Sequence, residues 1–198
     1  MSKNKEIQIQ NISKKYGEKQ VLKNYSATVK EGEITCFMAP SGMGKTTLLR
    51  ILSGLEKADT GTVDGIEGRK ISMVFQEDRL CENLNVISNI RLACEKEMTP
   101  VMIEKELEKV GLADCGYQPV SELSGGMKRR VALVRSLLAT YDLLILDEPF
   151  RGLDVENKKT VINYLLEKTK EKTVIFVTHE EEEVKFIGEN RICTLCML

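Results

Sequence analysis

The residues best suited to chemistry form one short glycine-rich segment of the chain. It fits the phosphate-binding pattern G-x-x-x-x-G-K-[ST] at every fixed position except the first, where alanine replaces glycine. Small residues let consecutive backbone N–H groups curve around phosphate oxygens, while a lysine reaches the terminal phosphates and a threonine hydroxyl ligates Mg²⁺. The predicted nucleotide-binding residues are Ala39, Pro40, Ser41, Gly42, Met43, Gly44, Lys45, Thr46 and Thr47.

The substitution at the first position of this loop has a definable cost. Ala39 adds a methyl group and loses easy access to positive φ, which would cost about 1 kcal/mol if the loop needs that conformation. The alternative interpretation is a glycine-rich turn without function. A β-prone run before the loop and a helical pattern after it favour phosphate binding.

A pair of acidic residues forms the second candidate feature. Asp147 and Glu148 directly follow the apolar run Leu143 to Leu146, so a buried strand would end in two carboxylates. Asp147 would stabilise Mg²⁺ through water, and Glu148 would orient or deprotonate the water that attacks a γ-phosphate. Two acids after a strand also serve as a helix cap, but their combination with the loop favours chemistry.

A third segment, Ser124-Gly125-Gly126, runs directly into the helical pattern of residues 131–138. A serine and two glycines at a helix start offer N–H groups, a hydroxyl and the positive end of the helix dipole to an anion. An ordinary serine N-cap is the alternative, and it is the weaker one when a phosphate loop precedes the segment by some 80 residues.

The elements that must position these residues follow an α/β pattern. Alternation and turn residues predict short antiparallel strands between residues 6 and 30. The segment 78–122 is predicted to be a helical insertion, in which Thr99 is the N-cap of a helix and Pro100 its first residue. Apolar β-prone runs separated by helical stretches predict a parallel sheet. The predicted strands of that sheet are Ile34–Met38, Ile71–Phe75, Leu143–Leu146 and Val174–Val177, with helices at 47–52 and 156–170.

Composition narrows the class of protein. The 198 residues carry a net charge of −1, with 42% hydrophobic and 30% charged residues, which argues against a generally basic nucleic-acid binder. No apolar run approaches the roughly 18 residues of a membrane span, and no secretory signal is apparent, so we expect a soluble cytoplasmic chain. Six cysteines are expected to be reduced, and a metal or redox role for Cys193 and Cys196 is disfavoured because no second ligand pair accompanies them.

The order of these motifs resembles that of ABC transporter ATPase subunits across nearly the whole chain. The resemblance implies a P-loop NTPase α/β fold of the ABC ATPase type, with a mixed core sheet and an N-terminal antiparallel β subdomain. A single domain over residues 1–198 is expected, with a core from 1–76 and 131–198 and a helical subdomain with the signature from 77–130.

The same resemblance extends the set of site residues. Tyr16 resembles the aromatic residue that stacks on adenine, Gln76 the glutamine that senses Mg²⁺ and the γ-phosphate, and His179 the switch histidine. It implies that Glu148 and His179 are catalytic and that ATP and Mg²⁺ are the cofactors. The implied metal residues are Thr46, Gln76 and, through water, Asp147.

Partners are also implied by the resemblance. In this family Ser124, Gly125 and Gly126 of one subunit would close over ATP held by another, which implies a head-to-tail dimer of ATPase subunits and, most simply, a homodimer. The segment after Gln76 would face a transmembrane permease made of separate chains, with a solute-binding protein and no nucleic acid as partner. The residues around 75–80 and 147–150 are most similar to importers of nitrate, sulfonates and taurine. The chain is expected to carry no fused regulatory or membrane domain and to lie at the cytoplasmic face of the membrane.

Three other functions compete with an ATPase that powers transport. A regulatory or adaptor subunit with weak turnover would explain Ala39 and Met127, which replaces the common signature glutamine, although Glu148 and His179 argue against it. A P-loop phosphotransferase would not need the Ser-Gly-Gly segment. A DNA-repair or translation ATPase of this fold would need a long coiled-coil insertion or a second domain.

Overall fold

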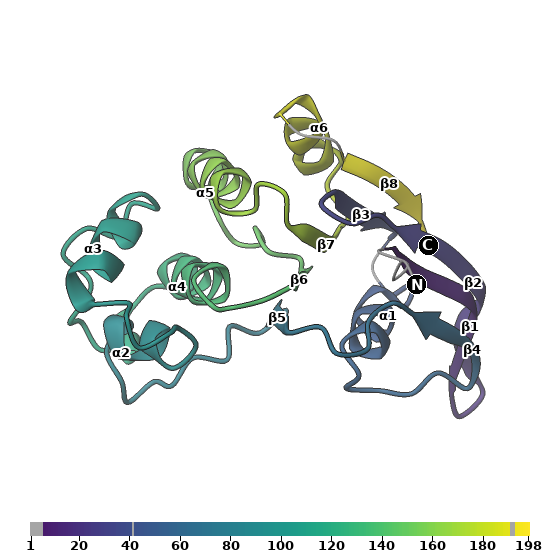
Figure 1. Ribbon diagram of the computed structural model, residues 1–198. Helices are drawn as coiled ribbons and strands as arrows, with labels where there is room; N and C mark the ends of the chain where they lie inside the picture. Colours follow the sequence, from purple (N-terminus) through teal and green to yellow (C-terminus); the bar gives the residue numbers. More distant parts are fainter. Residues whose placement is uncertain (1–5, 41, 191–192) are drawn as a thin grey trace. The chain divides into compact units, whose positions relative to one another are not determined.

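The computed structural model describes residues 6–40, 42–190 and 193–198 of the chain, and Figure 1 labels their helices and strands. These residues fall into two compact units. The first unit contains the described parts of 1–73, 142–148 and 171–198, and the second contains 74–141 and 149–170. Within the described ranges, no helix is both long enough and apolar enough to cross a membrane.

An antiparallel sheet of order β2-β1-β4 begins the first unit. Ile7, Ile9 and Ile12 of its central strand are buried, whereas Gln10 between them is exposed, as expected of a strand with one face on the core. The antiparallel start predicted from alternation is therefore confirmed. Its strands are β1 (Ile7–Tyr16), β2 (Lys19–Val29) and β4 (Thr60–Asp64).

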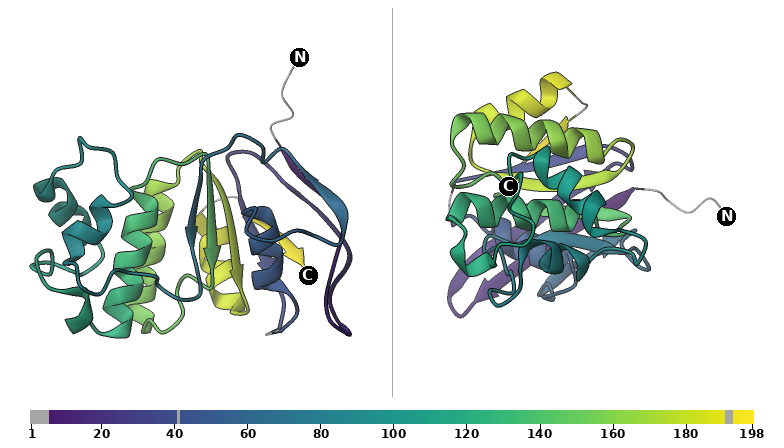
Figure 2. Two further views of the ribbon diagram at one scale, coloured as in Figure 1. Left: turned by 90° about the horizontal axis from the view of Figure 1, so that it is seen from below. Right: turned by 90° about the vertical axis from the view of Figure 1, so that its left-hand side faces the viewer.

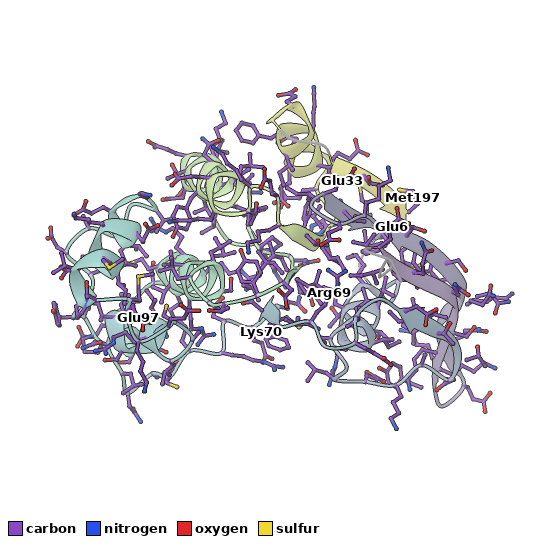
Figure 3. The ribbon with its side chains drawn as sticks, in the orientation of Figure 1. Glu6, Glu33, Arg69, Lys70, Glu97 and Met197 are labelled. Carbon is purple, nitrogen blue, oxygen red and sulfur yellow. The ribbon has the colours of Figure 1, made fainter. Side chains whose placement is uncertain are left out.

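The second sheet has the order β5-β6-β7-β3-β8. The ladders that join β6 to β7, β7 to β3 and β3 to β8 are parallel, which confirms the predicted parallel arrangement. Glu33, labelled in Figure 3, directly precedes β3, and its carboxylate accepts a hydrogen bond of 3.3 Å from the Thr194 hydroxyl of β8. The strands are β3 (Ile34–Met38), β5 (Ile71–Val74), β6 (Leu143–Asp147), β7 (Thr173–Thr178) and β8 (Cys193–Met197).

Helix α1 (Lys45–Leu52) joins the two sheets of the first unit into one core. Leu48, Leu49 and Leu52 are buried with side chains of both sheets, among them Ile9 and Ile145. Burial of side chains of this size stabilises the fold by roughly 1.5–3 kcal/mol each. The core therefore fixes the start of α1 relative to the ends of the parallel strands. The other helix of this unit is α6 (Glu181–Asn190).

The second unit is helical. As predicted, Thr99 caps a helix whose first residue is Pro100, and its hydroxyl accepts a hydrogen bond of 3.3 Å from the Met102 amide. Figure 2 shows the two longest helices of this unit, α4 and α5, side by side. The helices are α2 (Val86–Arg91), α3 (Pro100–Glu108), α4 (Gly125–Leu137) and α5 (Val155–Lys168), with a 3₁₀ turn at Val120–Glu122.

Candidate functional site

The phosphate-binding loop lies between the end of β3 and the start of α1. Gly42 and Gly44 have φ values of 83° and 86°, a conformation that glycine adopts without strain. Ala39 is buried and is not among the described non-glycine residues with positive φ. The backbone cost considered for Ala39 is therefore not incurred, because the first position of this loop does not adopt the left-handed conformation.

Lys45, the first residue of α1, turns its ammonium group into the loop. Its Nζ donates hydrogen bonds of 2.6 Å to the Ala39 carbonyl oxygen and 3.0 Å to that of Pro40, and the residue is only 6% exposed. The sequence pattern predicts the lysine but not these two carbonyl partners. They hold the positive charge inside the loop, next to the N–H groups at the start of the helix.

Thr46 and Asp147 bring the loop and the end of β6 together. The Thr46 hydroxyl donates a hydrogen bond of 2.9 Å to Asp147 Oδ2, and Asp147 is 2% exposed. A hydroxyl and a carboxylate supply the oxygen ligands that Mg²⁺ prefers, so these two residues fit the predicted metal. Gln76, the third predicted metal residue, belongs to the second unit and is exposed in the bend after β5.

The two predicted catalytic residues are in direct contact. His179 Nδ1 lies 3.2 Å from Glu148 Oε1, although the two residues follow different strands, β7 and β6. Glu148 has a φ of 45°, and its amide donates a hydrogen bond of 3.0 Å to the Val177 carbonyl oxygen. The contact can orient the carboxylate, and the histidine side chain remains about half exposed at 47%.

Tyr16 ends β1 in the same unit and is 47% exposed. Its hydroxyl donates a hydrogen bond to Glu56, a residue that the sequence analysis did not single out. The Lys14 ammonium lies 5.6 Å from the centre of the tyrosine ring. An aromatic face with its hydroxyl fixed is therefore present where the resemblance implies a base-stacking residue.

The Ser124-Gly125-Gly126 segment forms the first turn of α4 in the second unit. The Ser124 hydroxyl accepts a hydrogen bond of 3.3 Å from the Met127 amide, so the serine is an N-cap. Gly125 leaves open space, because a Cβ there would meet no described atom within 4 Å, whereas one on Gly126 would contact the Leu153 side chain at 3.6 Å. The cap and the exposed backbone at Gly125 occur together, so the two interpretations do not exclude one another.

Arg129 in the same helix was missed by the sequence analysis. The residue is 4% exposed, and its guanidinium donates to the Phe75 carbonyl oxygen at 2.6 Å, the Pro149 carbonyl oxygen at 2.9 Å and Asp78 Oδ1 at 3.1 Å. It thus ties the segment around Gln76 to the residue after Glu148. A basic residue in a helix is usually solvated, so the pattern gave no signal of this burial.

The structure thus groups the predicted residues by unit. The first unit holds the loop, Tyr16, Asp147, Glu148 and His179, and the second holds Gln76 and the serine-glycine segment. Ser41 and the side chains of Cys193 and Cys196 lie outside the described residues, and the expectations about them stay predictions.

Known proteins identify the family. The family model described as ABC transporter matches residues 22–151, more than half of the chain. The chain belongs to the ABC transporter family. An aliphatic sulfonates import ATP-binding protein, SsuB 1 of Rhodococcus jostii, is 40% identical over 185 residues, which cover 90% of this chain and 74% of that protein. The dimeric structure of MJ0796, a bacterial ABC transporter cassette, matches with a TM-score of 0.81 at 28% identity, covering 96% of this chain and 94% of the cassette.

Other ABC transporter relatives are longer. The sulfate/thiosulfate import ATP-binding protein CysA of Synechococcus elongatus is 36% identical over 199 residues, which cover 92% of this chain and 58% of the relative. The chain thus spans less than two thirds of the length of several curated relatives. Together with the cassette structure, these matches confirm the predicted ABC ATPase fold and the similarity to import proteins.

Proposed function

We propose that this chain binds ATP with Mg²⁺ and hydrolyses it to power import of a solute through a separate permease. The observation that carries the proposal is the meeting of Thr46 with Asp147 and of Glu148 with His179 in one compact unit. Further support comes from relatives that are named import ATP-binding proteins for sulfate/thiosulfate, aliphatic sulfonates and spermidine/putrescine. The solute is expected to depend on the permease and on a solute-binding protein.

Each side chain has a distinct role in this proposal. Lys45 and the loop N–H groups bind the phosphates, and Thr46 and Asp147 would hold Mg²⁺, which neutralises charge on the phosphate oxygens. Glu148 orients the attacking water or takes up its proton, and His179 Nδ1 keeps the Glu148 carboxylate in place. Tyr16 supplies a stacking surface for the base. Gln76 responds to the metal and the terminal phosphate.

The site is completed by a second subunit in this proposal. Ser124, Gly125 and Gly126 of one chain clamp the γ-phosphate of ATP held by its partner, so ATP binding closes a head-to-tail dimer and hydrolysis reopens it. The chain then acts as a single ABC ATPase domain, in which the helical subdomain expected over 77–130 lies within the second unit, formed by 74–141 and 149–170. That subdomain contacts the permease at the cytoplasmic face of the membrane.

The Glu148→Gln variant tests this function, because removal of the base should trap the closed dimer. We expect its mass in solution to double only when both ATP and Mg²⁺ are present. The matched control adds Lys45→Ala to Glu148→Gln and is expected to stay monomeric. A monomer at saturating ATP that nevertheless binds the nucleotide would contradict closure in the absence of permease.

Steady-state turnover separates the motor from the regulatory alternative. The wild-type chain is expected to release phosphate from ATP, and Glu148→Gln to slow release by about a hundredfold or more. ATP binding without turnover that exceeds that of Glu148→Gln would favour a regulatory or adaptor subunit instead.

A further inference from the structure

Tyr16 is connected to the helix of the phosphate-binding loop through the Glu56 carboxylate and through a side-chain hydrogen bond with Thr47. Its hydroxyl donates a hydrogen bond of 2.5 Å to Glu56 Oε1, across 40 residues of sequence. The Glu56 amide in turn donates a hydrogen bond of 3.1 Å to the carbonyl oxygen of Arg50 in the last turn of α1. The aromatic ring is thus fastened to the same helix whose first residue, Lys45, closes the loop.

The charges around Glu56 favour a fixed carboxylate. Its side chain is 16% exposed and lies 3.4 Å from Lys14 Nζ and 3.7 Å from Arg50 Nε. The hydrogen bond from Tyr16 and the interactions with Lys14 lower the pKa of Glu56, so the group is an anion at neutral pH. Burial and the hydrogen bond to Glu56 raise the pKa of Tyr16, which keeps its hydroxyl a donor.

Lys14 is itself restrained, so it cannot swing freely over the ring. Its Nζ donates to the Lys57 carbonyl oxygen at 2.8 Å and to Asp59 Oδ1 at 3.1 Å, and the ring centre of Tyr16 lies 5.6 Å away. The tyrosine remains 47% exposed between these contacts. The contacts therefore restrain the hydroxyl end and leave ring surface open to a flat ligand.

We propose that Glu56 is a positioning residue that holds the Tyr16 ring, through its hydroxyl, as a preformed surface for the base of a nucleoside triphosphate. The inference rests on the proposed function, because it takes Tyr16 to be the base-stacking residue. Ordering a side chain before binding removes that entropic cost from the binding step. Loss of the Glu56 carboxylate should affect the base and not the phosphates, since neither Glu56 nor Arg50 belongs to the loop that faces the phosphates and the hydrogen bond between Tyr16 and Thr47 stays available.

Calorimetric binding of ATP and of inorganic tripolyphosphate, which has no base, tests this role. Glu56→Leu removes the acceptor, and Tyr16→Phe removes the donor but keeps the ring. Each is expected to weaken ATP binding by about threefold to tenfold, the range for one side chain that must be ordered on binding. Tripolyphosphate binding by Glu56→Leu should be unchanged within about twofold, and the double variant should bind ATP no more weakly than Tyr16→Phe alone.

A conservative variant separates the hydrogen bond from the charge. Glu56→Gln loses the charge beside Lys14 and Arg50 but keeps an acceptor for the Tyr16 hydroxyl. Because the acceptor is kept, this variant should bind ATP nearly as tightly as the wild type does. Thermal unfolding of each variant shows whether its fold is retained.

The possible outcomes separate this inference from the function on which it rests. Failure of the wild-type chain to bind ATP would contradict the proposed function. Normal wild-type binding with an unaffected Glu56→Leu variant would overturn the positioning role alone, as would equal loss of ATP and tripolyphosphate binding. Additive losses in the double variant, or a Glu56→Gln variant as weak as Glu56→Leu, would also overturn it.

Discussion

Thr46 and Asp147 lie 101 residues apart in the sequence and are joined by a hydrogen bond of 2.9 Å from the threonine hydroxyl to Asp147 Oδ2. Thr46 belongs to the first turn of α1 and Asp147 ends β6. The bond therefore requires one particular position of the helix along the strand. Leu48 and Leu49 of α1 and Ile145 of β6 supply that packing from a shared core. The proposed metal-binding oxygens are thus positioned by apolar contacts.

Asp147→Asn should separate metal-dependent from metal-independent nucleotide binding. The amide keeps the shape of the carboxylate but removes its charge, so the increase in ATP affinity caused by Mg²⁺ should fall by about tenfold or more. ATP titrations with Mg²⁺ and with a chelator measure the two components. Affinity in the chelator should stay within about twofold of wild type, and an equal loss under both conditions would argue against a role at the metal.

Gly44 and Gly42 form a matched pair for testing the loop geometry. Both have positive φ, so alanine at either position should cost about 1 kcal/mol from backbone strain. A Cβ at Gly44 would also lie 2.6 Å from the Val21 carbonyl oxygen, whereas one at Gly42 would meet no described atom within 4 Å. Urea denaturation should show Gly44→Ala to be destabilised more than Gly42→Ala, by about 2 kcal/mol or more. Equal losses would contradict the close approach of β2 to the loop.

Arg129 should contribute more to stability than its neighbour Lys128. Arg129→Met leaves the Phe75 and Pro149 carbonyl oxygens and Asp78 without this buried donor, which should lower the free energy of unfolding by about 2–4 kcal/mol. Lys128→Met is the control, because Lys128 pairs at 3.2 Å with an exposed glutamate and should cost less than about 1 kcal/mol. Chemical denaturation of the two variants would show similar losses if the guanidinium were not structural.

The lowered pKa of Glu106 should make the free energy of unfolding depend on pH. Burial opposes ionisation of this carboxyl, but hydrogen bonds from Lys168 and Tyr164, at 2.6 and 2.8 Å, outweigh it and hold the pKa below the ordinary value of 4.5. A lowered pKa in the folded state adds stability at pH values above 4.5, and this contribution disappears as the pH falls through the lowered pKa.

The measurement for Glu106 is urea unfolding between pH 6 and pH 3 for wild type and Glu106→Gln. The free energy of unfolding of the wild type should fall more steeply below about pH 4.5, by at most about 1 kcal/mol because solvent screens the partly exposed group. Identical pH profiles would show that the carboxylate contributes no linkage.

The sequence predicted the elements well where apolar pattern and function coincide. The strand before the loop and the N-cap at Thr99 appear where expected, because a buried run and a capping threonine are local signals. Lys45 and Asp147 could be named because their residue types and spacing are restricted by the chemistry of phosphates and metals.

What the sequence did not predict depends on contacts between distant residues. Glu56 and Arg129 are ordinary charged residues by pattern, and their importance arises from a tyrosine 40 residues away and from two carbonyl oxygens in other segments. The backbone conformation of Ala39 was also open, since the pattern specifies a residue type and not a φ angle. Such features require the folded chain because no local periodicity encodes them.

The left-handed backbone conformation of Glu148 lowers the stability of the fold at the residue whose carboxylate is proposed to act in hydrolysis. A side chain with a φ of 45° costs roughly 1 kcal/mol that a glycine would not incur, and a hydrogen bond to the Val177 carbonyl oxygen helps hold the residue in that conformation. Glu148→Gly would relieve the strain and remove the carboxylate proposed to act on water. A laboratory selection of this protein for heat resistance alone would therefore not remove chains that have lost the proposed hydrolysis, so any such selection needs a simultaneous demand for activity.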